Sequence, residues 1–493
     1  MGRLTEPKVA LLKFDDDRTA TTEVSQMDRS RRTRRLRREV WELRHRFAQG
    51  GQGVFEQVLP TEEIMGTIEE SAPVFRHRHY PPLTTLRHFI EQVLSEDQAC
   101  QDVVGRRLSE RVGQRQSTCS LNTSAYCQAR QRLPQEMVDR LYRTTGERLE
   151  TRLPKSWRWR GRRLVLFDGT TVSMPDTLAS QCAFPQSAEQ QPGLGFPVAR
   201  LSGLIGLASG AVLGHAVSAC EGKGSGEQTM LRELIPLLQA GDVLLADALL
   251  ATWWIIADVT ARGADVLMFQ HGRRVTDFSV GETLGVRDHL VEWPRPKRPA
   301  WMNCADYESY PATLKLREAE VDNRVLVTTL PNEAQVTPRE LEQLYTLRWN
   351  IEVDWRTIKV TMHMDILRCK TPEMVRKEIS VHLLAYNLVR WSMASAAYLG
   401  EVLPRMLSFA GAKRLLVAFA TQLRRCPGRR LAFMFATVLG AIASLTLPLR
   451  PGRVEPRAKK RRPKKLPLLT VPRRLARQQI LERRMSARLN LAP

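Results

Sequence analysis

Two aspartates follow short apolar runs and are placed to share one site. Leu164 to Phe167 leads into Asp168, and Val243 to Ala246 leads into Asp247. Apolar strands of this kind are typical of a sheet covered on both faces, and they present their last side chain at its carboxyl edge. On neighbouring strands the two carboxylates would meet there and repel each other unless divalent cations lay between them. Each aspartate alone also fits a cap of the following turn or helix.

A third acid, Glu352, lies on a predicted long helix. Thr337 to Glu340 is a capping box with proline at the first helical position, and the next proline is Pro372. At 100° per residue, a strip of about 60° holds four polar residues, namely Tyr345, Arg348, Glu352 and Lys359. The adjacent apolar sector predicts that the helix lies on the sheet, through Leu344, Leu347, Ile351, Trp355, Ile358 and Met362. A salt-bridged surface helix, the alternative, explains Arg348 and Glu352 but neither Tyr345 nor Lys359.

The elements that must position these residues form an α/β pattern. Strands are predicted at residues 164–167, 198–207, 210–218, 243–246 and 265–269, with a turn at 208–210. Helices are predicted at residues 227–240 and 249–262, and a strand-rich stretch continues to about residue 329. This order predicts a mixed sheet flanked by helices.

Positive charge is concentrated at the two ends of the chain. The formal charge is +23, and residues 450–493 carry fifteen Lys and Arg against two Glu. Residues 29–46, within a predicted basic helix at 28–48, carry nine Arg against two Glu. A near-neutral body with cationic ends fits nucleic acid, because each neutralised phosphate releases counterions. Solvated tails and a membrane-surface patch are the alternatives.

Cysteine usage and hydropathy give expectations about compartment. The eight cysteines form no CxxC pair, so neither a zinc site nor a disulfide framework is predicted, and the start of the chain lacks the apolar core of a signal peptide. A cytoplasmic, nucleoid-associated protein is expected. Residues 431–449 are nineteen uncharged residues, long enough to span a bilayer, but polar residues and Pro448 within them favour a buried or interfacial helix.

A helical region precedes the strands. Residues 81–133 show helical periodicity, with a helix starting near Asn122 or Ser124. Its polar residues, Gln128, Arg130, Gln131 and Arg132, suit a helix that reads the major groove, although an ordinary exposed helix looks the same. A further helix is predicted at residues 473–489.

These residues resemble a known family. The spacing Tyr345-x2-Arg348-x3-Glu352-x6-Lys359, preceded by Asp168-Gly-Thr and Ala246-Asp247, resembles the insertion-sequence-4 group of DDE transposases. The resemblance covers roughly residues 80 to 390 and implies a ribonuclease-H-like core with a strand-rich insertion between the second and third acids. The domain organisation it suggests is a loose basic arm (1–80), a helical DNA-binding domain (81–155), a catalytic core (156–269 and 336–398), a β-rich insertion (270–335), a helical C-terminal region (399–449) and a basic tail (450–493).

The resemblance also implies a reaction. Asp168, Asp247 and Glu352 would hold two Mg²⁺ or Mn²⁺ ions about 3.5–4 Å apart, with Asp168 bridging both. Phosphate oxygens would be bound by Tyr345, Arg348 and Lys359, and DNA also by Arg130 and Arg132. The expected activity is cleavage at transposon ends and strand transfer into target DNA, by a homodimer on double-stranded DNA; whether a hairpin intermediate forms is left open.

Some positions depart from the family pattern. Relatives often place arginine after the second aspartate, where this chain has Ala248-Leu-Leu250, and the strand from Arg324 lacks the aromatic residue of some relatives. Trp293 and Trp301 are candidate substitutes, although packing at a rim is the favoured explanation for both. A catalytically inactive or decayed DNA-binding relative is therefore the alternative function.

Overall fold

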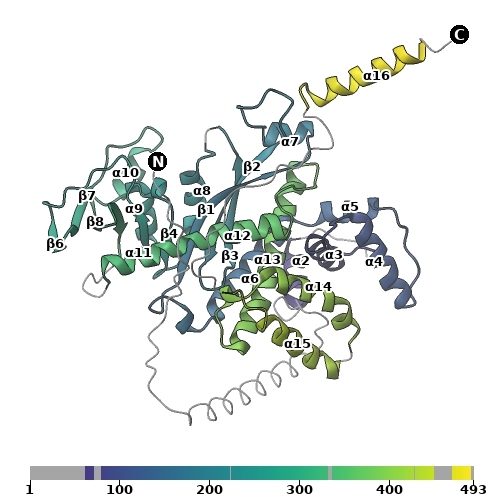
Figure 1. Ribbon diagram of the computed structural model, residues 1–493, viewed down its shortest axis with the longest axis horizontal. Coiled ribbons are helices and arrows are strands. Elements are labelled where there is room, and N and C mark those ends of the chain that lie inside the picture. The colour runs from purple at the N-terminus through teal and green to yellow at the C-terminus, as the bar shows by residue number, and fades with distance from the viewer. Residues whose placement is uncertain are drawn as a thin grey trace.

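A nine-stranded mixed sheet forms the centre of the part of the chain that the computed structural model describes, which is residues 61–71, 79–222, 224–330, 336–426, 428–448 and 469–489 (Figure 1). The strand order is β3-β2-β1-β4-β5-β9-β8-β7-β6. The strands are β1 (Leu164–Ser173), β2 (Val198–Gly206), β3 (Val212–Ala219), β4 (Val243–Leu245), β5 (Asp265–Phe269), β6 (Glu282–Gly285), β7 (Asp288–Pro294), β8 (Thr313–Val321) and β9 (Arg324–Thr328). The α/β prediction is confirmed, while the predicted basic helix at 28–48 lies outside the described residues.

The strand pairing explains how the sheet grows in two directions from β1. β1 pairs antiparallel with β2 and parallel with β4, and β4 pairs parallel with β5. The turn after β2 leads into β3 as an antiparallel hairpin, as predicted. β9 pairs antiparallel with β5. Beyond β9, the strands β8, β7 and β6 follow in that order, each antiparallel to its neighbour. The strand-rich stretch therefore extends the central sheet.

Each face of the sheet has its own hydrophobic core. Val165 and Phe167 of β1 pack with α8 (Glu227–Leu234) and α9 (Trp253–Ala261) on one face. Leu164 and Leu166 face the other core, which includes residues of α6 (Gln135–Arg152), α11 (Pro338–Thr346), α12 (Asn350–Arg356) and α13 (Pro372–Gly400). Alternating side chains of a strand point to opposite faces, so β1 contributes to both cores.

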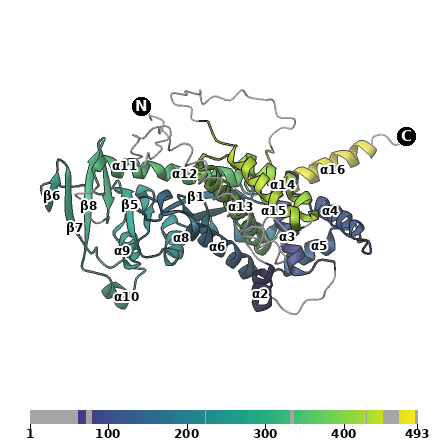
Figure 2. The same ribbon diagram turned by 90° about the horizontal axis from the view of Figure 1, so that it is seen from below.

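Helices gather at the end of the molecule remote from β6 (Figure 2). They are α2 (Thr61–Ser71), α3 (Pro82–Leu94), α4 (Cys100–Gly113), α5 (Ser124–Arg132), α14 (Phe409–Arg425) and α15 (Gly428–Ala443). The short helices α7 (Leu178–Ala183) and α10 (Cys304–Ser309) lie in connections, and α16 (Arg473–Leu489) extends away from the body (Figure 1). The helices predicted within 81–133 and at 473–489 are confirmed.

The uncharged stretch at 431–449 belongs largely to α15. Leu431, Val438 and Ile442 of this helix are buried in the core that also contains α13. No helix among the described residues is long and apolar enough to cross a bilayer. The expectation of a buried helix is confirmed for these residues.

Candidate active site

Asp168 and Asp247 stand at matching positions on neighbouring parallel strands. The ladder between β1 and β4 pairs Leu164 with Val243 and Leu166 with Leu245, and the same offset brings Asp168 level with Asp247. Both aspartates continue the face of Leu164 and Leu166, which is the face covered by α12. The two predicted strand-end acids are therefore neighbours.

One detail of the prediction is wrong: β1 does not end at Asp168. The strand continues to Ser173, because β2 pairs with it along that whole length, whereas the ladder with β4 stops at Leu245. Asp247 does cap the following turn, since its Oδ1 accepts a hydrogen bond from the Ala248 amide at 2.6 Å. Asp247 can therefore cap this turn and still belong to the candidate active site.

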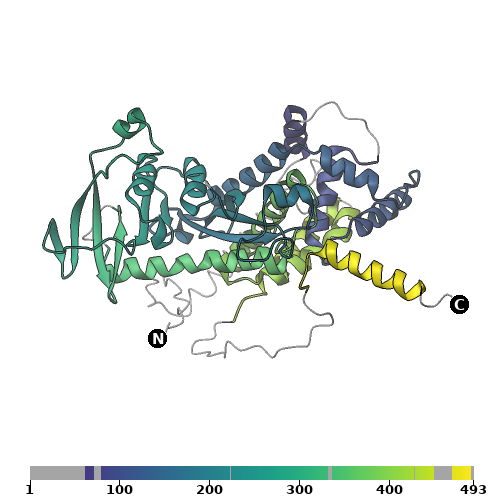
Figure 3. The same cartoon turned by 90° about the horizontal axis from the view of Figure 1, so that it is seen from above.

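The third acid, Glu352, lies on the predicted helix, and this helix is less regular than expected. The capping box at Thr337 is present, but a 3₁₀ turn (Leu347–Trp349) separates α11 from α12, and a π-helical turn (Thr357–Thr361) follows α12. Figure 3 shows α11 and α12 in line along one face of the sheet. The predicted apolar sector lies in the core, with Leu344, Ile351, Trp355, Ile358 and Met362 buried and Leu347 partly buried.

An open pocket of about 310 Å³ brings strand and helix together. Its lining comes from β1 and from the helix, as Asp168, Gly169, Thr170, Glu352, Trp355, Arg356, Lys359 and Val360. The Arg348 guanidinium lies between two of the acids, with its nitrogens 3.5 Å from Asp168 and 3.4 Å from Glu352. Lys359 donates a hydrogen bond from Nζ to Thr170 Oγ1 at 3.1 Å. Glu352 and Lys359 thus share one pocket with Asp168.

The electrostatics of the site are those of crowded carboxylates. Burial raises the pKa of Asp168, and Asp247 raises it further against the opposing effect of the Gly169 amide and Arg348. Burial likewise raises the pKa of Glu352, with Asp168 and Asp247 adding to the effect and Arg348 opposing it. Burial alone would lower the pKa of Arg348, but Tyr345 and the acids hold it above its usual value. Burial and neighbouring carboxylates thus disfavour the charged forms of Asp168 and Glu352, and a cation placed between the acids would favour those charged forms.

Tyr345 lies next to Arg348 on the side of the hydrophobic core. Its side chain is 8% exposed, and its ring packs edge-on against Phe269 with centroids 4.4 Å apart. The Arg348 guanidinium carbon is 6.0 Å from the Tyr345 ring centroid. Tyr345 is therefore placed to support Arg348 from the core side.

The two arginines of α5 differ in exposure. Arg130 is 9% exposed, its guanidinium packs over the rings of Phe89 and Tyr126, and one of its nitrogens is 3.4 Å from the Gln92 amide oxygen. This burial contradicts the expectation that Arg130 contacts DNA, because its guanidinium cannot reach a phosphate without leaving the core. Arg132 is exposed at the end of the helix.

The two candidate aromatic substitutes also differ. Trp293 is 2% exposed, and its indole nitrogen donates a hydrogen bond to Glu318 at 2.8 Å, so its ring is not available for stacking on a base. Trp301 is 61% exposed and lies beneath the Arg232 guanidinium, whose carbon is 4.7 Å from the ring centroid.

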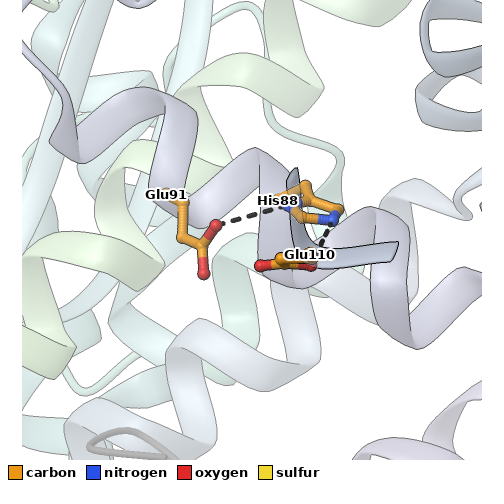
Figure 4. Close-up of side chains that lie close together, drawn as sticks. All are labelled: His88, Glu91 and Glu110. Atoms are coloured by element: carbon orange, nitrogen blue, oxygen red, sulfur yellow. Dashed lines mark hydrogen bonds and ion pairs between the residues drawn. The ribbon is translucent and has the colours of Figure 1, made fainter. Parts of the chain in front are cut away.

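A second group of possible metal ligands lies away from this pocket, between α3 and α4 (Figure 4). Ligand atoms of His88, Glu91 and Glu110 lie within 4.8 Å of one another, with Nδ1 of His88 3.3 Å from Glu91 and Nε2 3.7 Å from Glu110. Arg87 and Arg107 also contact Glu110, at 3.2 and 3.4 Å. Because two guanidinium groups already neutralise Glu110, the group is an ion-pair network that joins two helices.

Sequence reasoning missed Asp354, two residues after Glu352. Its carboxylate is fully buried and accepts hydrogen bonds from Tyr386 at 3.0 Å, Arg390 at 2.6 Å and Arg405 at 2.9 Å. It ties α12 to α13 and to the start of the C-terminal helices. The available signal was its place at the border of the apolar sector, where a charged residue needs a buried partner.

Comparisons with known proteins show similarity to transposases. Residues 159–388 match the family described as Transposase DDE domain. This range includes Asp168, Asp247 and Glu352. The chain is 28% identical over 357 residues to the transposase InsG for insertion sequence element IS4 of Escherichia coli (strain K12), covering 71% of this chain and 79% of that protein. It is also 37% identical over 65 residues to the transposase for insertion sequence element IS421 of Escherichia coli, covering 13% of this chain and 17% of that protein.

The match to the DDE domain over residues 159–388 and the similarity to InsG confirm the resemblance to the insertion-sequence-4 group of DDE transposases. Among solved structures, a piggyBac transposase synaptic complex with hairpin DNA aligns over 82% of this chain and 86% of that chain, with a TM-score of 0.41 and 10% identity.

Proposed function

We propose that this protein catalyses metal-dependent phosphoryl transfer on DNA, cutting at the ends of an insertion element and joining the freed 3′ ends to target DNA. The observation that supports this most strongly is that Asp168 of β1 and Glu352 of α12 line one pocket, with Asp247 close to both from the turn that follows β4. Two carboxylates beside a buried strand pair and a third from the helix, close to Arg348 and Lys359, match the needs of phosphoryl transfer.

The fold supports a ribonuclease-H-like core. Strands β3, β2, β1, β4 and β5 are neighbours in that order, with β2 antiparallel to β1 and β4 parallel to it. Strands β6 to β9 lie in sequence between Asp247 and Glu352. In this proposal they form the insertion between the second and third acids.

The donor set fits a hard divalent cation. Asp168, Asp247 and Glu352 offer carboxylate oxygens, the ligands that Mg²⁺ and Mn²⁺ prefer. Burial, with a smaller contribution from the neighbouring carboxylates, raises the pKa of Asp168 and Glu352, and a bound cation would favour their charged forms. When bound, such ions activate the attacking water or 3′ hydroxyl and stabilise the leaving oxygen.

The chain's own cations bind the substrate. Lys359 points its ammonium to Thr170 at the pocket wall, where a phosphate beside the scissile bond would lie. Arg348 is held by two acids and becomes available to a phosphate oxygen as those acids take up cations. Tyr345 supports Arg348, and Arg132 remains an exposed candidate for contact with double-stranded DNA. A homodimer on DNA completes the proposal.

The test is a cleavage assay on labelled DNA duplexes that carry the inverted repeats flanking the coding sequence. Asp168→Asn, Asp247→Asn and Glu352→Gln should each lower Mg²⁺-dependent cleavage more than about 100-fold, beyond the effect typical of outer-shell residues, and leave DNA binding nearly intact. Asp176→Asn, a change at an exposed acid just after β1, is the matched control.

Two results would overturn the proposal. Near-wild-type cleavage by any one of the three variants removes that residue from the site. Binding of the ends without cleavage by the wild-type protein in Mg²⁺ and Mn²⁺ favours the alternative, a catalytically inactive DNA-binding relative.

A further inference from the structure

A fourth carboxylate approaches the site from the opposite face of the sheet. Glu227 is the first residue of α8. The next residue, Gln228, donates a hydrogen bond to the Leu249 carbonyl at 3.2 Å, and Leu249 is two residues beyond Asp247. The first turn of α8 is therefore joined to the loop that carries the second acid.

Glu227 also lies against the strand that carries the first acid. A Cβ built on Gly169 would lie 3.1 Å from Glu227 Oε1 and 3.2 Å from Ser202 Oγ. Gly169 is a regular residue of β1 and has no positive φ, so its backbone conformation does not require glycine. What the missing side chain provides is room for the Glu227 carboxylate beside Asp168.

Glu227 lies near the point where the ladder between β1 and β4 ends. Asp168 and Gly169 point to opposite faces, but the ladder with β4 stops at Leu245. Beyond Leu166, β1 is therefore open on the side of β4, and groups from both faces of the sheet can approach this open edge. Asp247 lies there too.

Glu227 has no neutralising partner of its own. Among the residues that the structure describes, it makes no hydrogen bond or ion pair, although it is half-buried. The nearby Arg200 donates to the Ser225 carbonyl at 3.2 Å. Burial raises the pKa of Glu227, Arg200 opposes this, and Asp168 and Asp247 raise it further. A half-buried carboxylate that lies near two others is costly unless a cation offsets its charge.

We propose that Glu227 is a fourth carboxylate of the cation site, which enters from α8 to bind a divalent ion held by Asp168. This inference rests on the proposed function, because it assumes that Asp168 holds the ion. It assigns Gly169 the role of leaving space for that carboxylate.

The experiment is calorimetric titration of the full-length protein with Mn²⁺ in the absence of DNA. Glu227→Gln should weaken Mn²⁺ binding about 10-fold or more, on the scale of lost metal-site partners. Glu227→Asp keeps the charge but retracts it, so it should lose most of the affinity if the carboxylate binds the ion directly. The control is Glu233→Gln, at an exposed position on the same helix. Unfolding midpoints in chelator show whether the variants remain folded.

Two further variants make the outcomes distinct. If Asp168→Asn weakens Mn²⁺ binding but Glu227→Gln does not, the inference about Glu227 is overturned and the proposed function stands. If neither variant changes Mn²⁺ binding, the cation site itself is overturned. Gly169→Ala should weaken binding in the wild-type background and have little further effect with Glu227→Gln, because both act on one carboxylate; full additivity would count against the assigned role of Gly169.

Discussion

Lys359 donates a hydrogen bond to Thr170 at 3.1 Å. This contact joins the turn after α12, which follows Glu352, to the strand segment that follows Asp168. It places an ammonium group on the wall of the pocket lined by both acids. A positive group at that position suits a DNA phosphate next to the one that reacts.

Lys359→Ala should lower cleavage by about 10- to 100-fold, the range expected when a hydrogen bond from a charged group is lost. The Mg²⁺ concentration that gives half-maximal cleavage should not change, because no metal ligand is removed. Cleavage rates over a Mg²⁺ series check this, with Lys370→Ala at an exposed position as the control. A clear shift in the Mg²⁺ requirement would assign Lys359 to the cation site instead.

Asp168→Asn should stabilise the metal-free protein at neutral pH. Burial raises the pKa of Asp168 in the folded state, so the folded protein binds this proton more tightly than the unfolded chain does. The associated stability is complete below the unfolded pKa of about 4 and is lost as the pH rises through the folded pKa. In chelator at pH 7 the thermal unfolding midpoint of the variant should therefore lie above that of the wild type.

The same comparison has two internal checks. The difference between Asp168→Asn and wild type should shrink as the pH falls toward the ordinary carboxyl range. Added Mg²⁺ should stabilise the wild type more than the variant, since only binding to the folded state adds stability. A variant that is less stable than wild type in chelator at pH 7 would mean that the contact with Arg348 outweighs the repulsion.

Asp354→Ala should destabilise the fold by about 3–5 kcal/mol, as expected when one partner of a buried ion pair is removed. The reason is that Arg390 is 4% exposed and would keep a buried charge without its partner. Urea unfolding measures the loss, and Asp365→Ala, at an exposed position nearby, should change stability by less than about 0.5 kcal/mol. A small effect at Asp354 would show that the arginines find other acceptors.

Truncation after Leu449 should weaken DNA binding of all sequences about equally. The removed segment carries fifteen Lys and Arg against two Glu, and cations on phosphates give affinity without sequence information. Binding constants over a salt series should show a flatter salt dependence for the truncated protein. Replacing Lys459, Lys460, Arg461 and Arg462 with glutamine in the full chain should give a smaller change in the same direction. A loss confined to element ends would instead mean that the tail reads bases.

The pattern of residue types was enough to predict the main parts of the site. Apolar runs that end in Asp168 and Asp247 imply buried neighbouring strands, and the 3.6-residue period places Glu352 and Lys359 on one side of a helix. Both inferences depend on local geometry, which the sequence controls directly. They hold although the helix contains a 3₁₀ turn and a π turn, since Glu352 and Lys359 still line one pocket.

Contacts between distant segments could be decided only by the tertiary structure. Arg130 has the sequence context of an exposed helix, yet α3 and its own α5 enclose it between Phe89 and Tyr126. Asp354 is buried because α13 supplies arginine and tyrosine partners. Glu227 lies beside Gly169 because α8 packs on β2 and β3, with its first turn bonded to the loop that follows β4. Burial and pairing of charges depend on which surfaces meet when the chain folds, and a local pattern carries no information about the partner surface.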